Sequence, residues 1–225
     1  MKRFYLSYIL LLVLAQGLFA QSSFEGTLEM DAKLAQMGEV PIPATFSMKG
    51  DRMKLVTDFG MGETTVYFDK ASDRVVAVLA AMNMGFELNP SQVPPREGDI
   101  ISPAPASNGK RETINTFACD GFTCQFADGL EMEIWATRDM PNGVHRALLN
   151  SFSSSIETIL KVSTSSFADL VNKGYAPVRT IVRKNGKETA ALTISKFENQ
   201  PLDDAIFTIP TNVPIRKFNA AMMGE

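Results

Sequence analysis

The chain has 225 residues, with 22 lysines and arginines against 25 aspartates and glutamates, a net charge of −3. A weakly acidic chain without a basic run lacks the electrostatic footprint of a nucleic-acid-binding protein, or of one that binds anionic lipid surfaces. The length suits one domain and is enough to bury a hydrophobic core.

The amino terminus has the pattern of an export signal. Lys2 and Arg3 precede an apolar run over residues 8–14, and the small residue Ala20 follows it. This order predicts a signal peptide over residues 1–20 and an exported protein, in the periplasm or alternatively fully secreted. No later stretch is apolar over the length that a membrane-spanning helix needs. We therefore expect residues 21–225 to form a single domain that does not span a membrane.

Alternating hydrophobicity predicts the first strand over residues 24–34. Apolar or small residues take every second position, and charged or hydroxyl residues take the positions between. This period of two is typical of a strand with one buried and one solvated face. Similar runs separated by turn residues predict an antiparallel meander. Its further strands cover residues 53–59, 65–68, 74–79, 84–88, 111–117, 122–126 and 130–137.

Residues 89–110 interrupt the strand pattern. This segment is poor in apolar residues and contains the prolines Pro90, Pro94, Pro95, Pro103 and Pro105. We interpret it as a long, mobile surface loop. A domain boundary is the alternative, which we reject because only the second half of the chain has helices to cover the sheet of the first half.

The hydrophobic period changes after residue 140. Apolar residues at every fourth position, with two more beside them, predict an amphipathic helix over about residues 143–161. Ser166 and Asp169 resemble a capping signal and Gly174 suits a helix end, so a short second helix is expected between them. Asn185-Gly186 separates alternating runs at 178–183 and 188–197, which predicts a β-hairpin. The fold class is therefore mainly β, of the α+β type.

Catalytic chemistry is nearly absent from the sequence. His145 is the one histidine, and it falls at the start of the predicted long helix rather than beside a nucleophile. Glu131 and Glu133 lie on the solvated side of one predicted strand. No group of cysteines, histidines and carboxylates has the spacing of a metal site, and there is no glycine-rich phosphate loop. We expect no enzyme activity, no cofactor and no metal.

Three geometries are open for the only two cysteines, Cys119 and Cys124. A two-residue turn at Asp120-Gly121 would put them on a diagonal roughly 7–8 Å apart, beyond the usual reach of a disulfide. A four-residue loop over 120–123 would place them face to face, and they could then bond. A strand that runs straight through and turns at Asp128-Gly129 would separate them by about 16 Å. The sequence leaves the possible disulfide undecided.

Several short motifs resemble a bacterial envelope family. They are Phe24–Thr27, Ile114–Cys119, Phe122, Gln125–Phe126, Glu133–Thr137 and Asp203–Pro210. This pattern is similar to domain-of-unknown-function family 4412, which is related to the outer-membrane lipoprotein carrier LolA. The chain departs from the pattern at Thr116, Phe117 and Phe122, and Cys124 is additional. The resemblance covers most of residues 21–225.

The resemblance implies a fold and a site. The fold would be a curved antiparallel sheet, an incomplete β-barrel, with one long and one short helix packed on its concave face. Cys119 would lie inside a strand, with the turn at Asp128-Gly129. An apolar cavity between the sheet and the helices could hold acyl chains. Its expected lining is Leu28, Met30, Met53, Leu55, Phe59, Met132, Ile134, Leu148 and Phe152.

We therefore expect an exported, monomeric envelope protein that binds or carries a lipid, an acyl chain or a lipoprotein. The alternative is a non-catalytic accessory protein of the envelope with a filled core, which acts through protein–protein contacts.

Overall fold

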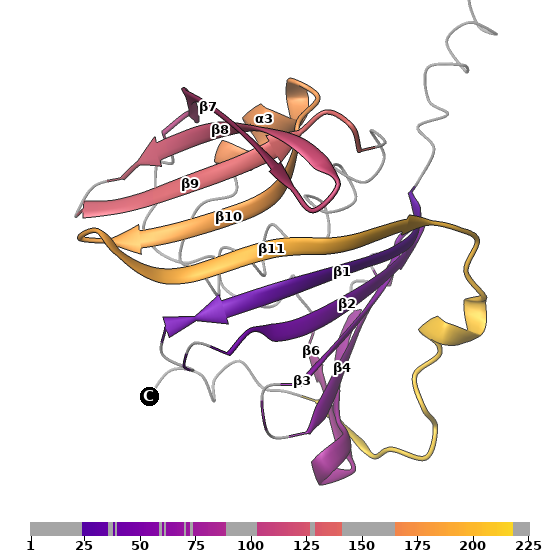
Figure 1. Cartoon of the computed structure of the whole chain (residues 1–225). Helices are drawn as coiled ribbons and strands as arrows, with labels where there is room; N and C mark the ends of the chain where they lie inside the picture. Colours follow the sequence, from indigo (N-terminus) through magenta and orange to yellow (C-terminus); the bar gives the residue numbers. More distant parts are fainter. Residues whose placement is uncertain are drawn as a thin grey trace, which may run out of the picture.

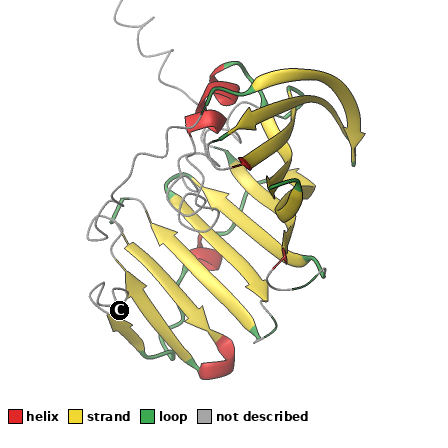
Figure 2. Cartoon of the chain, turned by 90° about the vertical axis from the view of Figure 1, so that its left-hand side faces the viewer, coloured by secondary structure: helices red, strands yellow, loops and turns green. Residues whose placement is uncertain are grey.

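A single sheet of 12 strands forms the body of the protein in the computed structural model (Figure 1). The structure describes residues 24–35, 38, 40–58, 60, 62–69, 71–72, 74–88, 103–126, 129–140 and 165–217. The strand order across the sheet is β12-β6-β5-β4-β3-β2-β1-β11-β10-β9-β8-β7, and the sheet is open rather than closed into a barrel. Figure 2 shows the strands side by side in one layer.

The first half of the chain forms a meander in which neighbours in sequence pair in antiparallel fashion, as predicted. Its strands are β1 (Glu25–Leu34), β2 (Ile42–Lys49), β3 (Arg52–Asp58), β4 (Glu63–Asp69), β5 (Arg74–Leu79) and β6 (Met84–Leu88). A short 3-10 turn, η2 (Ala80–Met82), connects β5 to β6. The strand β2 was not among the predicted ones; it contains Pro43 and follows a stretch without clear alternation.

The second half adds β7 (Ala106–Ile114), β8 (Phe117–Gln125), β9 (Leu130–Thr137), β10 (Ala176–Lys184) and β11 (Lys187–Asn199). The predicted hairpin is confirmed: β10 and β11 pair across Asn185 and Gly186, both with positive φ, as this tight turn requires. The long strand β11 then pairs with β1 and joins the two halves into one sheet. The register shifts once along this pair, between Glu29 and Met30.

The predicted pair of helices, one long and one short, is not supported by the structure. The one α-helix among the described residues is α3 (Ser165–Asn172), the predicted short helix, and Gly174 follows it at φ 82°. The predicted long helix over residues 143–161, with His145, Leu148 and Phe152, lies outside the described residues. So does the predicted signal peptide.

The predicted loop over residues 89–110 needs a correction at its end. Residues 106–110 belong to β7, while residues 89–102 lie outside the described residues. β7 is the last strand of the sheet, and most of its side chains are exposed. Because neither face of its first part is buried, that part carries no hydrophobic alternation, and the sequence pattern could not indicate a strand.

Both cysteines lie in β8, which runs straight through them and leads to the turn before β9. Cys119 and Cys124 are both buried and are not bonded to each other. They are five residues apart and so face opposite sides of the strand, where they join different hydrophobic clusters. Of the three predicted geometries the structure has the third, and the possible disulfide is not formed.

The core is divided into three clusters. The largest packs Leu28, Phe46 and Met53 with Trp135 and Val178. The second packs residues of β8–β11, including Met132 and Ile134, against Leu170 of α3. The third lies under the end of the chain and is described below. Four consecutive residues at the end of β9, Ile134–Thr137, are buried, so this strand is covered on both faces.

Candidate functional site

One face of the sheet carries an apolar surface that crosses seven strands. Cross-strand neighbours follow one another in rows, because residues paired in adjacent strands point to the same side. The central row consists of Phe197, Leu28, Phe46, Leu55, Val66, Ala77 and Phe86. A second row consists of Ile194, Met30, Ala44, Thr57, Thr64, Leu79 and Met84. We call these two rows the apolar face.

Neither row contains a charged residue. The charged side chains of the same strands point to the other face, where they form ion pairs such as Lys196–Glu29 at 3.5 Å and Arg74–Glu87 at 2.7 Å. The alternation predicted for residues 24–34 therefore corresponds to two different faces of β1, one apolar and one charged.

Burial along the apolar face is uneven. Leu28 and Phe46 are 0% and 3% exposed, so they are core residues in full. Leu55, Val66 and Ala77 are only partly buried. An apolar ligand could therefore contact the central row over β3–β6, whereas Leu28 and Phe46 of the same row are already packed.

The residues expected to line an apolar cavity also differ in burial and in position. Leu28 is a buried core residue on the apolar face, and Met30 and Leu55 are partly buried there. Met53, two residues before Leu55 in β3, is a buried core residue on the same side of the sheet but outside the two rows. Met132 and Ile134 are fully buried in the separate cluster beside α3. The last three of the expected residues, Phe59, Leu148 and Phe152, lie outside the described residues. The structure thus brings together four of the nine.

The opposite face of β4–β6 is covered by the end of the chain, which sequence reasoning did not anticipate. Residues 200–217, here called the C-terminal strap, follow β11 and include η5 (Asp204–Phe207) and β12 (Ile215–Lys217). Figure 1 shows the strap in yellow, leaving β11 and running down beside the lower strands. The only sequence signal in this segment was the closing motif Asp203–Pro210. It indicated the family resemblance, but it did not indicate that the segment packs on the sheet.

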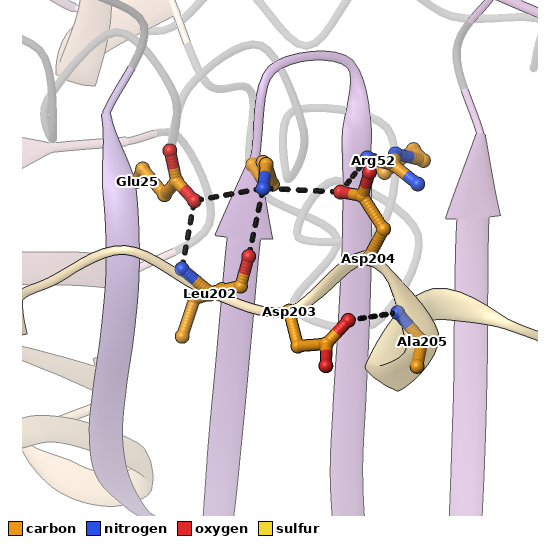
Figure 3. Close-up of polar contacts among 7 residues, drawn as sticks. Glu25, Arg52, Leu202, Asp203, Asp204 and Ala205 are labelled. Atoms are coloured by element: carbon orange, nitrogen blue, oxygen red, sulfur yellow. Dashed lines mark hydrogen bonds and ion pairs between the residues drawn. The ribbon is translucent and has the colours of Figure 1, made fainter.

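A charged network attaches the start of the strap to β1–β3 (Figure 3). The ammonium of Lys49 lies 3.1 Å from Glu25 and 3.0 Å from Asp204, and it donates to the Leu202 carbonyl at 2.7 Å. The Leu202 N–H donates to the Glu25 carboxylate at 2.7 Å, and Arg52 contacts Asp204 at 2.6 Å. The backbone N–H and C=O groups of Leu202 are therefore both hydrogen-bonded to side chains of the sheet.

The network shifts the pKa values of its members. The pKa of Glu25 is lowered, first by the Leu202 N–H and then by Lys49. The pKa of Asp204 is lowered by hydrogen bonds from Lys49 and Arg52, and that of Lys49 is raised by its two carboxylate partners. All three groups are therefore held in their charged forms at neutral pH.

Beyond the network, the strap packs on Tyr67, Val76 and Val78 through Ile209, Val213 and Ile215. A hollow of about 320 Å³ remains between the strap and the sheet. It is lined by Arg52, Tyr67, Phe68, Asp69, Arg74, Val76, Phe207 and Ile209. The guanidinium of Arg52 lies over the Phe207 ring at 5.1 Å.

Cys119, Glu131 and Glu133 are the described residues that were considered for catalysis or reactivity, and each has a structural explanation. Burial raises the pKa of the Cys119 thiol to about 11, so it is protonated and unreactive at neutral pH. Glu131 and Glu133 pair with Arg183, at 3.6 Å and 2.7 Å. Within the described ranges no three metal-ligating side chains come together. No described helix has the length and apolar character needed to cross a membrane.

The match to a protein-family model covers residues 24–213, described as a domain of unknown function, DUF4412. The chain belongs to this family. The family match confirms the resemblance seen in the motifs at both ends and in the middle of the chain. No curated protein matches the sequence of this DUF4412 protein.

Solved structures show a similar fold at low sequence identity. An uncharacterized conserved protein from Thermus thermophilus matches with a TM-score of 0.52 and 11% identity, over 88% of this chain and 92% of that one. A chain of the Pseudomonas aeruginosa MucA/MucB complex matches with a TM-score of 0.50 and 10% identity, over 84% of this chain and 56% of that one. A LolA superfamily protein from Nitrosomonas europaea matches over 85% of this chain and 92% of that one, at 12% identity and a TM-score of 0.35. The fold comparison rests on the first two.

Proposed function

We propose that this DUF4412 protein is a non-catalytic, exported envelope protein that binds an acyl chain of a lipid or lipid-modified partner on the apolar face of β3–β6. The observation that carries the proposal is the uncharged row Leu55, Val66, Ala77, Phe86, which is continuous with the core yet only partly buried. Contact with an acyl chain would remove this surface from water, which is favourable roughly in proportion to the area covered.

Two further observations support this function. The apolar pattern at the amino terminus is that of an export signal, and family membership agrees with the motifs of a bacterial envelope family. The charged groups of the same strands lie on the opposite face, so an acyl chain on the apolar face would leave no charge without water or a partner.

The first experiment is native mass spectrometry of the protein purified gently from its own envelope, followed by extraction of any bound lipid. Binding of a fluorescent fatty acid is then compared in two matched variants. Val66→Asn places an amide on the apolar face, and Val56→Asn places the same group on the other face of the neighbouring strand. Both valines are partly buried. We expect a loss of about tenfold in affinity for Val66→Asn only, which corresponds to about 1.4 kcal/mol.

A second function, through protein–protein contacts, is favoured by the complete burial of Leu28 and Met53, which resembles a filled core. The similar chain from Pseudomonas aeruginosa also comes from a two-protein complex. A purified protein free of lipid, together with equal fatty-acid affinities of the two valine variants, would contradict the acyl-chain proposal and favour this second function.

A further inference from the structure

The sheet residues beneath the C-terminal strap, here called its seat, are more deeply buried than the strap residues that pack on them. The seat is formed by Tyr67, Val76 and Val78, which are 9%, 0% and 9% exposed. No residue of the strap, all of which the structure describes, is buried to that degree, and Ile209 and Ile215 remain partly exposed. The sheet residues of this contact are as buried as those of a protein core, whereas the strap residues remain partly accessible to water. Segments with few buried contacts open more readily than the core beneath them.

The strap also pairs with the sheet over a very short length. Its last part, β12, is parallel to β6 over three pairs that begin at Ile215 and Gly85, and Gly85 donates a hydrogen bond to the Pro214 carbonyl at 2.9 Å. Among the described strands β6 ends the antiparallel part of the sheet, so without β12 its edge would pair with no described strand. An open strand edge is a template for another extended segment.

The contacts at the start of the strap are polar and solvated. The side chains of Lys49 and Glu25 are 30% and 32% exposed, and that of Asp204 is 66% exposed. Ion pairs with this exposure contribute little to stability and are weakened by salt. The hollow of about 320 Å³ beside Phe207 and Ile209 shows in addition that the strap does not fill its seat.

We propose that the outer side of β4–β6 is a binding groove for an extended segment of another protein, and that the strap occupies it within the same chain until it is displaced. The strap itself defines the chemistry of the partner. A carboxylate would meet Lys49 and Arg52, apolar side chains would take the places of Ile209, Val213 and Ile215, and the backbone would pair with the β6 edge. This groove is on the face opposite the apolar face, so it does not depend on acyl-chain binding.

The test uses the full chain with a protease site inserted between the exposed residues Gln200 and Pro201, folded first and then cut. The probe is a labelled synthetic peptide with the sequence of residues 200–217. We expect saturable binding to the cut protein and binding at least about tenfold weaker to the uncut protein, because the tethered strap competes at a high effective concentration.

Gly85 offers a specific control. A Cβ added there would lie 2.5 Å from Cδ1 of Ile215. Gly85→Ala should therefore weaken peptide binding to the cut protein, and a peptide with Ile215→Ala should recover it. If the inserted site prevents folding, the uncut Gly85→Ala chain is used instead, and it should bind the peptide with Ile215→Ala better than the wild-type chain does.

Three outcomes would overturn the proposal. The first is a cut strap that stays in place and exchanges with no peptide. The second is a peptide with both Val213→Asp and Ile215→Asp that binds as well as the original. The third is a dimer of the uncut chain with exchanged straps, which would assign the groove to a second copy.

Discussion

Replacing Leu28 or Leu55 by alanine separates the packed part of the apolar face from the part offered to a ligand. Both leucines belong to the central row, on either side of Phe46. Leu28 is 0% exposed, and truncation of a buried leucine costs about 2–5 kcal/mol of unfolding free energy because a cavity is added to the lost transfer energy. Leu55 is partly in water already, so we expect a cost of about 1 kcal/mol.

The assay is urea unfolding followed by the fluorescence of Trp135, the single tryptophan, which is buried in the same cluster as Leu28. Each variant is measured with and without a fatty acid. A ligand that binds only the folded state raises its stability in proportion to the logarithm of its concentration over Kd. We expect Leu55→Ala to reduce this ligand-dependent gain, and Leu28→Ala to lower the stability without ligand while leaving most of the gain.

The reasoning would be refuted if Leu55→Ala were as destabilising as Leu28→Ala, because the apolar face would then be filled throughout. A ligand-dependent gain that is the same in wild type and Leu55→Ala would equally contradict the placement of the ligand on β3–β6.

Three other predictions concern the sheet, the thiol and the strap. Gly26→Ala should destabilise by more than Gly50→Ala in urea unfolding, because the new Cβ would lie 2.1 Å from the Glu198 carbonyl, whereas at Gly50 it meets no atom and costs about 1–2 kcal/mol for its positive φ alone. Cys119, with its raised pKa, should resist iodoacetamide at neutral pH and react only after unfolding; rapid labelling of the folded protein would contradict its burial. Glu25 and Asp204 have lowered pKa values in the folded protein. Their contribution to the stability of the folded state is therefore complete above their ordinary pKa values of 4.5 and 3.8, and it is lost as the pH falls through the lowered values. Limited proteolysis of the strap should therefore accelerate at acidic pH, and should do so much less in a Glu25→Gln, Asp204→Asn variant.

Local sequence was enough to predict the features that depend on near neighbours. Alternation over residues 24–34 predicted both β1 and its two-sided character, and Asn185-Gly186 predicted the β10–β11 hairpin. Ser166, Asp169 and Gly174 predicted the short helix α3. These signals are local because a strand's two faces, a tight turn and a helix end each need particular residue types within a few positions.

Long-range packing, in contrast, sets which strands meet and which apolar side chains stay accessible. Nothing near Leu28 or Phe197 in sequence indicates that β1 pairs with β11, and the polar first part of β7 has no buried face to produce a pattern. Leu28 and Leu55 look alike in sequence, yet one is sealed in the core and the other is partly open. Burial depends on what packs above a residue, and the packing segments come from distant parts of the chain, so periodicity can assign a side chain to a face but cannot show whether that face is covered.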